Sequence, residues 1–254
     1  MEDKMLQRLV CKLRLPENSS IKYIPGDALH GVIMEHIDTE YADILHNQDS
    51  QPFSQFAEVK NDNIYWTIHT LINEAGQYIV NTIADNKFNS FHLKRLNTDV
   101  SIVEKNHSDI TMDDLVNQYY FEQSEREFRV EFVTPTAFKR QDTYVFHPDL
   151  HLFFGSLMRK HSSIFESSSE IDIETHEILV ENSKIVRYDL RSVYYQVERV
   201  RLPAFRGTIV IKMSGAQSLI NYANFLMRFG EYSGVGIKSA MGMGAFRLIP
   251  RNIS

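Results

Sequence analysis

The chain has 254 residues, of which 43% are hydrophobic and 24% are charged, so it can bury a full core and is not a disordered segment. No apolar run approaches the roughly 18 residues of a membrane helix, and the charged start MEDKMLQRLV does not resemble an export signal, which favours a cytosolic protein. A net charge of −6 excludes a uniformly basic surface, and the single Cys11 excludes an internal disulfide.

The first half of the sequence predicts alternating strands and helices. Period-two alternation of apolar residues indicates strands, and Cys11 falls on the buried face of the first of them. Apolar residues at helical spacing from Leu29 to Leu45 indicate one long helix. The predicted strands cover 5–15, 52–60, 64–71 and 91–103, and the predicted helices cover 28–45 and 74–83. Asp113 and Asp114 are expected to cap a short helix that follows.

The second half repeats this order. We expect strands at 128–134 and 143–146, a helix that Pro148 opens, a surface excursion at 167–183, strands at 186–202 and 207–213, and a last helix. Two copies of a β-α-β-β-α-β unit therefore fit the chain, with a boundary near 122–126.

Positive charge is concentrated at the C-terminal end. Residues 184–254 hold eleven Lys or Arg and three Asp or Glu, whereas the remainder is strongly acidic. Within the strand predicted at 186–202, alternate positions place four arginines and Tyr195 on one face. Such a face can grip phosphates and stack an unpaired base. A solvated edge strand protected by arginines is the alternative.

The tail GVGIKSAMGMGAF, from Gly234 to Phe246, has two Gly-X-Gly pairs that flank Lys238. Glycines with exposed N–H groups and one lysine suit phosphates. The order helix, loop, strand excludes a dinucleotide fingerprint, and Lys238 follows Ile237 rather than the glycine of a Walker motif. The alternative is a tight helix-to-strand connection whose glycines serve packing.

This tail resembles the glycine-rich loop of the CRISPR repeat-RNA-processing endoribonucleases of the RAMP superfamily. Three further stretches are similar to parts of that family: LHGVIMEHI with YADILH (29–46), FVTPTAFKRQDTYVFHP (132–148) and RVRLPAFRGTIVIKMSG (199–215). The resemblance covers nearly the whole chain. It implies an α+β fold of two tandem ferredoxin-like domains, 1–124 with the catalytic histidine and 125–254 with the glycine-rich loop.

The resemblance also implies site residues. His46 stands where many members carry their catalytic histidine, and an ordinary helix-terminal histidine is the alternative. His30 is the second catalytic candidate, or else a core histidine. Several relatives have a tyrosine where this chain has Met34, and the lysine of the family is missing, with Lys60 as the nearest candidate. The residues expected to bind RNA are Gly234, Gly236, Lys238, Ser239, Gly242, Gly244, Arg187, Arg191, Arg199, Arg201, Lys139 and Arg140.

The implied activity is cleavage of CRISPR precursor RNA within its repeats by attack of a 2′-hydroxyl, without a metal or other cofactor. His147 and His151 have the spacing of a helical metal pair, but Pro148 lies between them. The alternative is a RAMP-type subunit that binds RNA without cutting it. The expected partner is CRISPR repeat RNA, a multisubunit CRISPR effector complex is a further candidate partner, and the protein is expected to be a monomer or homodimer.

Overall fold

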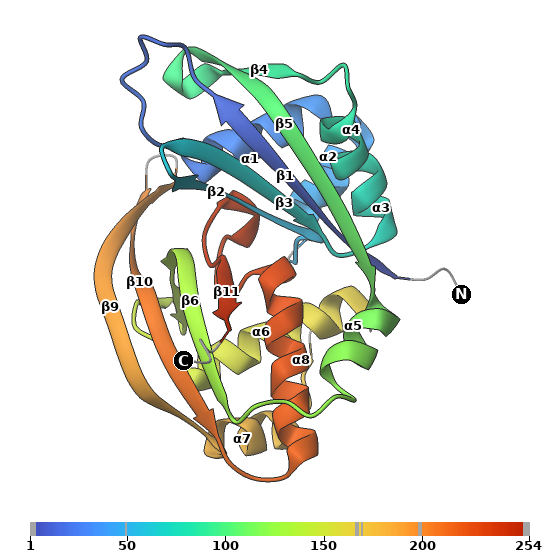
Figure 1. The fold of residues 1–254 in the computed structure, drawn as a ribbon, viewed down its shortest axis with the longest axis vertical. Coiled ribbons are helices and arrows are strands. Elements are labelled where there is room, and N and C mark those ends of the chain that lie inside the picture. The colour runs from blue at the N-terminus through green and yellow to red at the C-terminus, as the bar shows by residue number, and fades with distance from the viewer. Residues whose placement is uncertain (1–3, 49, 166–167, 169, 198–199, 251–254) are drawn as a thin grey trace.

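Two antiparallel sheets follow one another along the chain, each with helices packed on one face (Figure 1). The computed structural model describes residues 4–48, 50–165, 168, 170–197 and 200–250. No helix in these described ranges has the length and apolar character needed to cross a bilayer.

The first sheet has the strand order β2-β3-β1-β5-β4. Its strands are β1 (Met5–Arg14), β2 (Phe53–Lys60), β3 (Asn63–Thr70), β4 (Ser90–Leu93) and β5 (Thr98–Thr111). Its helices are α1 (Gly26–His36), α2 (Thr39–Asn47) and a continuous helical stretch made of α3 (Asn73–Ala75), a π-turn (Gly76–Val80) and α4 (Asn81–Ala84). A 3₁₀ turn (Lys94–Leu96) separates β4 from β5. Apart from the added edge strand β4, this is the order of a ferredoxin-like unit.

The second sheet has the order β11-β6-β10-β9, again that of a ferredoxin-like unit. Its strands are β6 (Glu127–Thr136), β9 (Ser183–Val197), β10 (Val200–Met213) and β11 (Phe246–Ile249), and β7 (Phe138–Arg140) with β8 (Thr143–Val145) forms a separate hairpin. The helices are α5 (Met112–Tyr119), α6 (Leu150–Phe165), α7 (Ile173–Glu181) and α8 (Gln217–Ser233). The predicted α+β fold with tandem ferredoxin-like units is confirmed.

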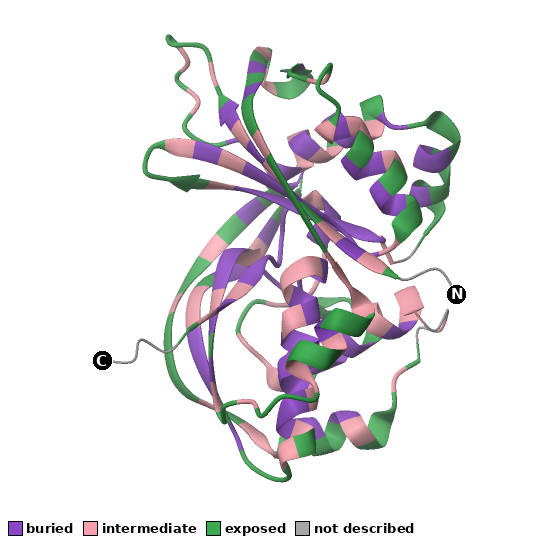
Figure 2. Ribbon diagram, turned by 45° about the vertical axis from the view of Figure 1, so that its right-hand side comes forward, coloured by how far each residue is buried: buried purple, intermediate pink, exposed green. Residues whose placement is uncertain are grey.

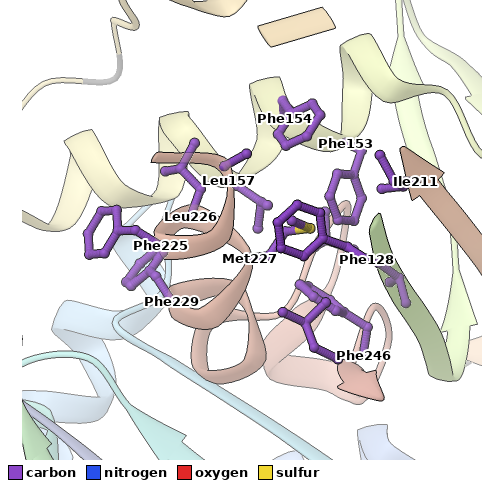
Figure 3. Close-up of a cluster of buried hydrophobic side chains, with 14 of the residues drawn as sticks. Phe128, Phe153, Phe154, Leu157, Ile211, Phe225, Leu226, Met227, Phe229 and Phe246 are labelled. Atoms are coloured by element: carbon purple, nitrogen blue, oxygen red, sulfur yellow. The ribbon is translucent and has the colours of Figure 1, made fainter. Parts of the chain in front are cut away.

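The apolar faces of the helices cover each sheet. Figure 3 shows Phe225, Leu226 and Phe229 together on one side of α8, with Leu157 of α6 next to Leu226, and Phe128 of β6 on the other side of α8 beside Met227. Their spacing along α8 matches one face of a helix, and that face is removed from water. Figure 2 shows buried residues gathered between sheets and helices, with the edge strand β9 largely exposed.

The long helix predicted at 28–45 is wrong in one respect, because it is two helices. α1 ends at His36, and Asp38 caps α2 by accepting hydrogen bonds from the amides of Glu40 and Tyr41. Asp38 is a favoured N-cap residue, so the new helix starts in a different direction. His30 and His46 therefore lie on neighbouring helices rather than at the two ends of one helix.

The structure corrects four further predictions about strands, helices and caps. The strand predicted at 186–202 spans the β9–β10 hairpin, and the predicted surface excursion contains α7, whose His176 and Leu179 are buried. α6 starts after Pro148, with Asp149 accepting from the amide of Leu152. The cap of α5 is Thr111, and Asp113 and Asp114 lie in the first turn.

A buried glutamine on β2 joins the two halves of the chain. The amide nitrogen of Gln55 donates to the carbonyl of Gly26 at 2.7 Å and to that of Ala240 at 2.9 Å. Its oxygen accepts from the indole of Trp66 at 3.0 Å. Gln55 thus fixes the start of α1 against the glycine-rich loop. Although its side chain is buried, both the amide nitrogen and the oxygen have hydrogen-bond partners.

His69 makes this junction sensitive to acid. Its ring is buried between Phe56 and Tyr232, and burial lowers its pKa to about 3. The unfolded chain takes up this proton near pH 6.5, so the free energy of unfolding falls as the pH drops from 6.5 towards 3. We expect His69 alone to lower the free energy of unfolding by about 2 kcal/mol between pH 7 and pH 5. Chemical denaturation of wild type, His69→Gln and the exposed-surface control His107→Gln checks this. An equal pH slope in all three would contradict it.

Candidate functional site

A cavity of about 490 Å³ lies where the two halves of the chain meet. It is lined by α1, by the end of α2 and the segment after it, by α6, and by the glycine-rich loop from Gly236 to Met241. Both predicted catalytic histidines, His30 and His46, contribute to its wall, together with Lys238 and Ser239 of the loop. Segments nearly 200 residues apart in the sequence therefore form one site.

His46 lies in the last turn of α2 and is exposed. Two other residues of the cavity wall, Met34 of α1 and Leu45 of α2, are apolar. Met34 lines this cavity at the sequence position where several related proteins are expected to have a tyrosine. The thioether of Met34 cannot transfer a proton. Lys60, the nearest substitute in sequence for the missing lysine, pairs with Glu58 at 2.6 Å and does not line this cavity.

His30 is half-buried on α1, and its ring stacks on Phe53 with centroids 6.0 Å apart. Burial lowers the pKa of His30 to about 4, and the electrostatic effects of His46 and Lys238 act in the same direction, against Asp27. At neutral pH His30 is therefore an uncharged imidazole. It can accept a proton, but it does not carry the extra proton that an imidazolium could donate. Because it opens on the cavity, it is not an enclosed core histidine.

The glycine-rich loop turns at Lys238, which has left-handed backbone geometry (φ +56°, ψ +37°) ahead of a 3₁₀ turn (Ser239–Met241). Hydrogen bonds within the described residues use the amides of 234–237 and 241–244. Those bonds leave the amides of 238–240 available at the wall of the cavity. Successive amides across a left-handed and a right-handed residue form a concavity that suits an anion.

Backbone geometry and close packing account for the glycines of this loop, and their contact with RNA stays a prediction. Gly236 has φ +74°, and a Cβ there would lie 2.2 Å from the carbonyl oxygen of Ala137. At Gly242 a Cβ would meet the Tyr195 hydroxyl at 2.7 Å, and Gly234 and Gly244 are buried. The glycines are therefore needed for backbone geometry and close packing, while the residues between them face the cavity.

Lys160 of α6 is a cavity residue that the sequence analysis missed. Its ammonium donates to the carbonyls of Ser233 (2.9 Å) and Gly234 (3.1 Å) and to the hydroxyl of Ser239 (2.9 Å). Burial lowers its pKa to about 7. One signal was available in the sequence. Lys160 falls on the apolar face of its helix with Phe153 and Leu157, where a charged side chain is stable only if it has hydrogen-bond partners.

The predicted basic face of one strand does not exist as such. Arg201 lies on β10, where it stacks over Tyr194 at 4.1 Å on the face opposite to Arg187 and Arg191. Arg187 lines a different cavity, on the open face of the second sheet. Tyr195 is buried with its hydroxyl on the carbonyl of Met241, so it cannot stack on a base.

Two other predicted RNA-binding residues, Lys139 and Arg140, do not line this cavity. Lys139 pairs with Asp142 at 2.6 Å, and Arg140 pairs with Asp149 at 2.9 Å. Arg199 lies outside the described residues. His147 precedes α6 and His151 lies within it, so they are not a pair on one helix. In the described part of the chain, no three His, Cys, Asp or Glu side chains are grouped to hold a metal ion.

Comparisons with known proteins agree on one family. A family model described as CRISPR-associated endoribonuclease Cas6 matches residues 130–246. The CRISPR-associated endoribonuclease Cas6 of Streptococcus thermophilus is 35% identical over 223 residues, covering 87% of this chain and 90% of that protein. The Cas6 of Mycobacterium tuberculosis H37Rv is 35% identical over 226 residues, covering 89% of this chain and 72% of that protein.

Solved structures show the same fold. The product complex of a Thermus thermophilus Cas6 matches with a TM-score of 0.78 at 18% identity, covering 97% of this chain and 100% of that one. The product of a Cas6-related gene from Pyrococcus furiosus matches with a TM-score of 0.61 at 12% identity, covering 98% of this chain and 100% of that one.

Proposed function

The chain belongs to the Cas6 family of CRISPR-associated endoribonucleases, and from this we propose that it cuts CRISPR precursor RNA once within each repeat, at the cavity between α1, α2 and the glycine-rich loop. The observation that carries the proposal is the meeting of two imidazoles and an anion-binding turn around one space. RNA supplies its own nucleophile, so a pair of proton carriers and a cradle for the phosphate are sufficient chemistry.

The proposed reaction is a transesterification within the RNA chain. The 2′-oxygen upstream of the cut forms a bond to phosphorus, and the bond from phosphorus to the 5′-oxygen breaks. One proton leaves the 2′-hydroxyl and one is added to the departing 5′-oxygen. The products are a 2′,3′-cyclic phosphate and a 5′-hydroxyl, and no step requires a metal ion.

His30 and His46 take different proton roles in this scheme. The lowered pKa of His30 keeps it neutral, so it accepts the proton of the 2′-hydroxyl. The negative phosphate beside it raises that pKa towards its ordinary value and strengthens the base when RNA is bound. His46 is then the residue that donates to the 5′-oxygen, since it faces the same cavity.

Charge on the phosphoryl oxygens is met by the glycine-rich loop. Residues 238–240 line the cavity, and in this proposal their amides and the ammonium of Lys238 meet the phosphate, while Lys160 holds Ser239 and the end of α8 in place. Preorganised donors of this kind need no rearrangement as the charge develops. With the chain divided at residue 124, as we propose, the first domain brings both histidines and the second brings the cradle.

The second candidate function is RNA binding without cleavage, which the apolar Met34 favours because it leaves one family position without a proton carrier. The two functions differ in one assay. Repeat RNA incubated with the protein in excess EDTA is expected to be cut, leaving a 5′-hydroxyl on the downstream fragment. Gel mobility before and after treatment with a 5′-kinase detects that end. Loss of cutting in EDTA with recovery in magnesium would contradict metal independence, and no cutting in any condition would favour the binding subunit.

Lys238 is expected to contribute to affinity and not to the chemical step. We expect Lys238→Asn to weaken binding of repeat RNA and to reduce the slope of log affinity against log salt by about 1, because one phosphate contact is lost. Asparagine tolerates the left-handed backbone of this position, so the variant keeps its fold. The control is Lys87→Asn, at an exposed lysine that does not line this cavity. Equal salt slopes in wild type and Lys238→Asn would contradict the role.

A further inference from the structure

A second cavity, of about 580 Å³, lies on the other side of α1. It is bounded by α1, by β4 and the turn after it, and by Met241 of the glycine-rich loop. His30 and Met241 line both cavities, so the two spaces adjoin at these side chains. An RNA chain with its reacting phosphate at His30 has its neighbouring nucleotides within reach of the second cavity.

The charges of the second cavity are already balanced. Lys94 pairs with Glu35 at 2.6 Å, Arg95 pairs with Asp27, and His92 pairs with Asp99 at 2.8 Å. Carboxylates beside Lys94, Arg95 and the His92 ring make this a poor site for a phosphate, unlike the amide turn at Lys238. They leave a space with apolar walls at Ala28 and Val32 and polar groups at its rim, which suits a neutral, flat and partly polar group.

Gly31 opens this space. It lies in the middle of α1, it is exposed, and a Cβ built on it would meet no atom within 4 Å. Nothing in the backbone or in the packing therefore requires a glycine here, and glycine inside a helix is less favourable than alanine. The missing side chain enlarges the cavity at the position next to His30.

We propose that the cavity beside Gly31 takes the base of a nucleotide that flanks the cut. The proposal rests on the proposed function and adds to it a site at which the enzyme reads the RNA. Imidazole and guanidinium planes such as those of His92 and Arg95 can stack on an unpaired base. The carboxylate of Glu35 can only accept hydrogen bonds, so it favours a base that presents an exocyclic amine, such as adenine or cytosine.

Filling the cavity tests the proposal. Gly31→Leu is compared with wild type on repeat RNAs that each lack the base at one nucleotide near the mapped cut. The leucine meets open space, so its melting temperature is expected to be no lower than that of wild type. On intact RNA the variant is expected to cut at least about tenfold more slowly. At one flanking position, removal of the base is expected to slow wild type by a similar factor and to leave Gly31→Leu unchanged or faster.

Two results would overturn the proposal. One is a Gly31→Leu variant that cuts and binds intact RNA like wild type. The other is an equal loss in both proteins at every position without a base. Affinity for an uncleavable repeat RNA is measured in parallel, so that a wild-type protein that binds without cutting still reports on the base cavity. A wild type that neither binds nor cuts repeat RNA would instead refute the proposed function.

Glu35→Ala tests the preferred base, because it removes the hydrogen-bond acceptor. Replacing the flanking nucleoside by one that lacks the exocyclic amine is expected to slow wild type and to have no further effect in Glu35→Ala. Glu40→Ala, at an exposed glutamate on the next helix that lines neither cavity, is the control. An equal effect of the missing amine in wild type and in both variants would remove Glu35 from the recognition of the base.

Discussion

A repeat RNA that carries a 2′-deoxynucleotide immediately upstream of the cut is expected to bind with nearly wild-type affinity and not to be cleaved. Only the nucleophile is removed, whereas the phosphates that meet Lys238 and the loop amides remain. Single-turnover cleavage and filter binding measure the two effects separately. Removal of the nucleophile abolishes the reaction entirely, so the expected loss is limited only by the detection of the product.

The matched control is the same RNA with the deoxynucleotide one position downstream, which should be cut at the normal rate. Cleavage of the upstream-substituted RNA at a normal rate would show that water attacks the phosphate. In that case the neutral imidazole of His30 would activate a water molecule, and the proposed products would be wrong.

His46→Ala is expected to slow single-turnover cleavage by at least about 10²-fold, because the departing 5′-oxygen loses its proton donor. The affinity for repeat RNA should change little, since the side chain is exposed and no hydrogen bond within the described residues ties it to the fold. His107→Ala, on an exposed position of β5, is the control for loss of a surface histidine.

His30→Ala separates the roles of the two imidazoles. Its ring stacks on Phe53, so the variant is expected to lose some stability as well as rate. Because the pKa of His30 is lowered in the free protein, the acid limb of the pH profile of kcat/KM, which reports the free enzyme, should lie at lower pH in wild type than an ordinary histidine would give. If His46→Ala keeps full activity while a folded His30→Ala is inactive, the assignment of the two roles is wrong and His46 is not required for cleavage.

Regular patterns in the sequence were sufficient to predict the fold. Alternating residues such as Leu9, Cys11 and Leu13 indicate a half-buried strand wherever they occur, and two repeats of strand and helix order leave few topologies. The errors came from caps and turns. α1 ends at His36 and Asp38 caps α2 inside a continuous apolar pattern, and the unbroken alternation at 186–202 covers parts of two strands, β9 and β10.

The candidate site was predictable only in part. His30, His46 and Lys238 could be named from the sequence, and the structure places all three around one cavity. Lys160 and Gln55 could not be named, because their importance comes from partners more than 70 residues away, at the loop and at Ala240. The arginine face failed for a related reason, since the side of a sheet to which a residue points depends on where the hairpin turns.

The order of the segments along the chain also sets when the protein becomes competent during its synthesis. Both imidazoles are made within the first fifth of the chain, but the turn at Lys238 and its support from α8 are among the last segments to be made. Domains generally fold from the N-terminus as they are synthesised, so a nascent chain can hold a finished first sheet and still have no phosphate cradle. A chain that stops before residue 234 would therefore hold both proposed proton carriers without the proposed phosphate cradle, and we expect it not to cut RNA.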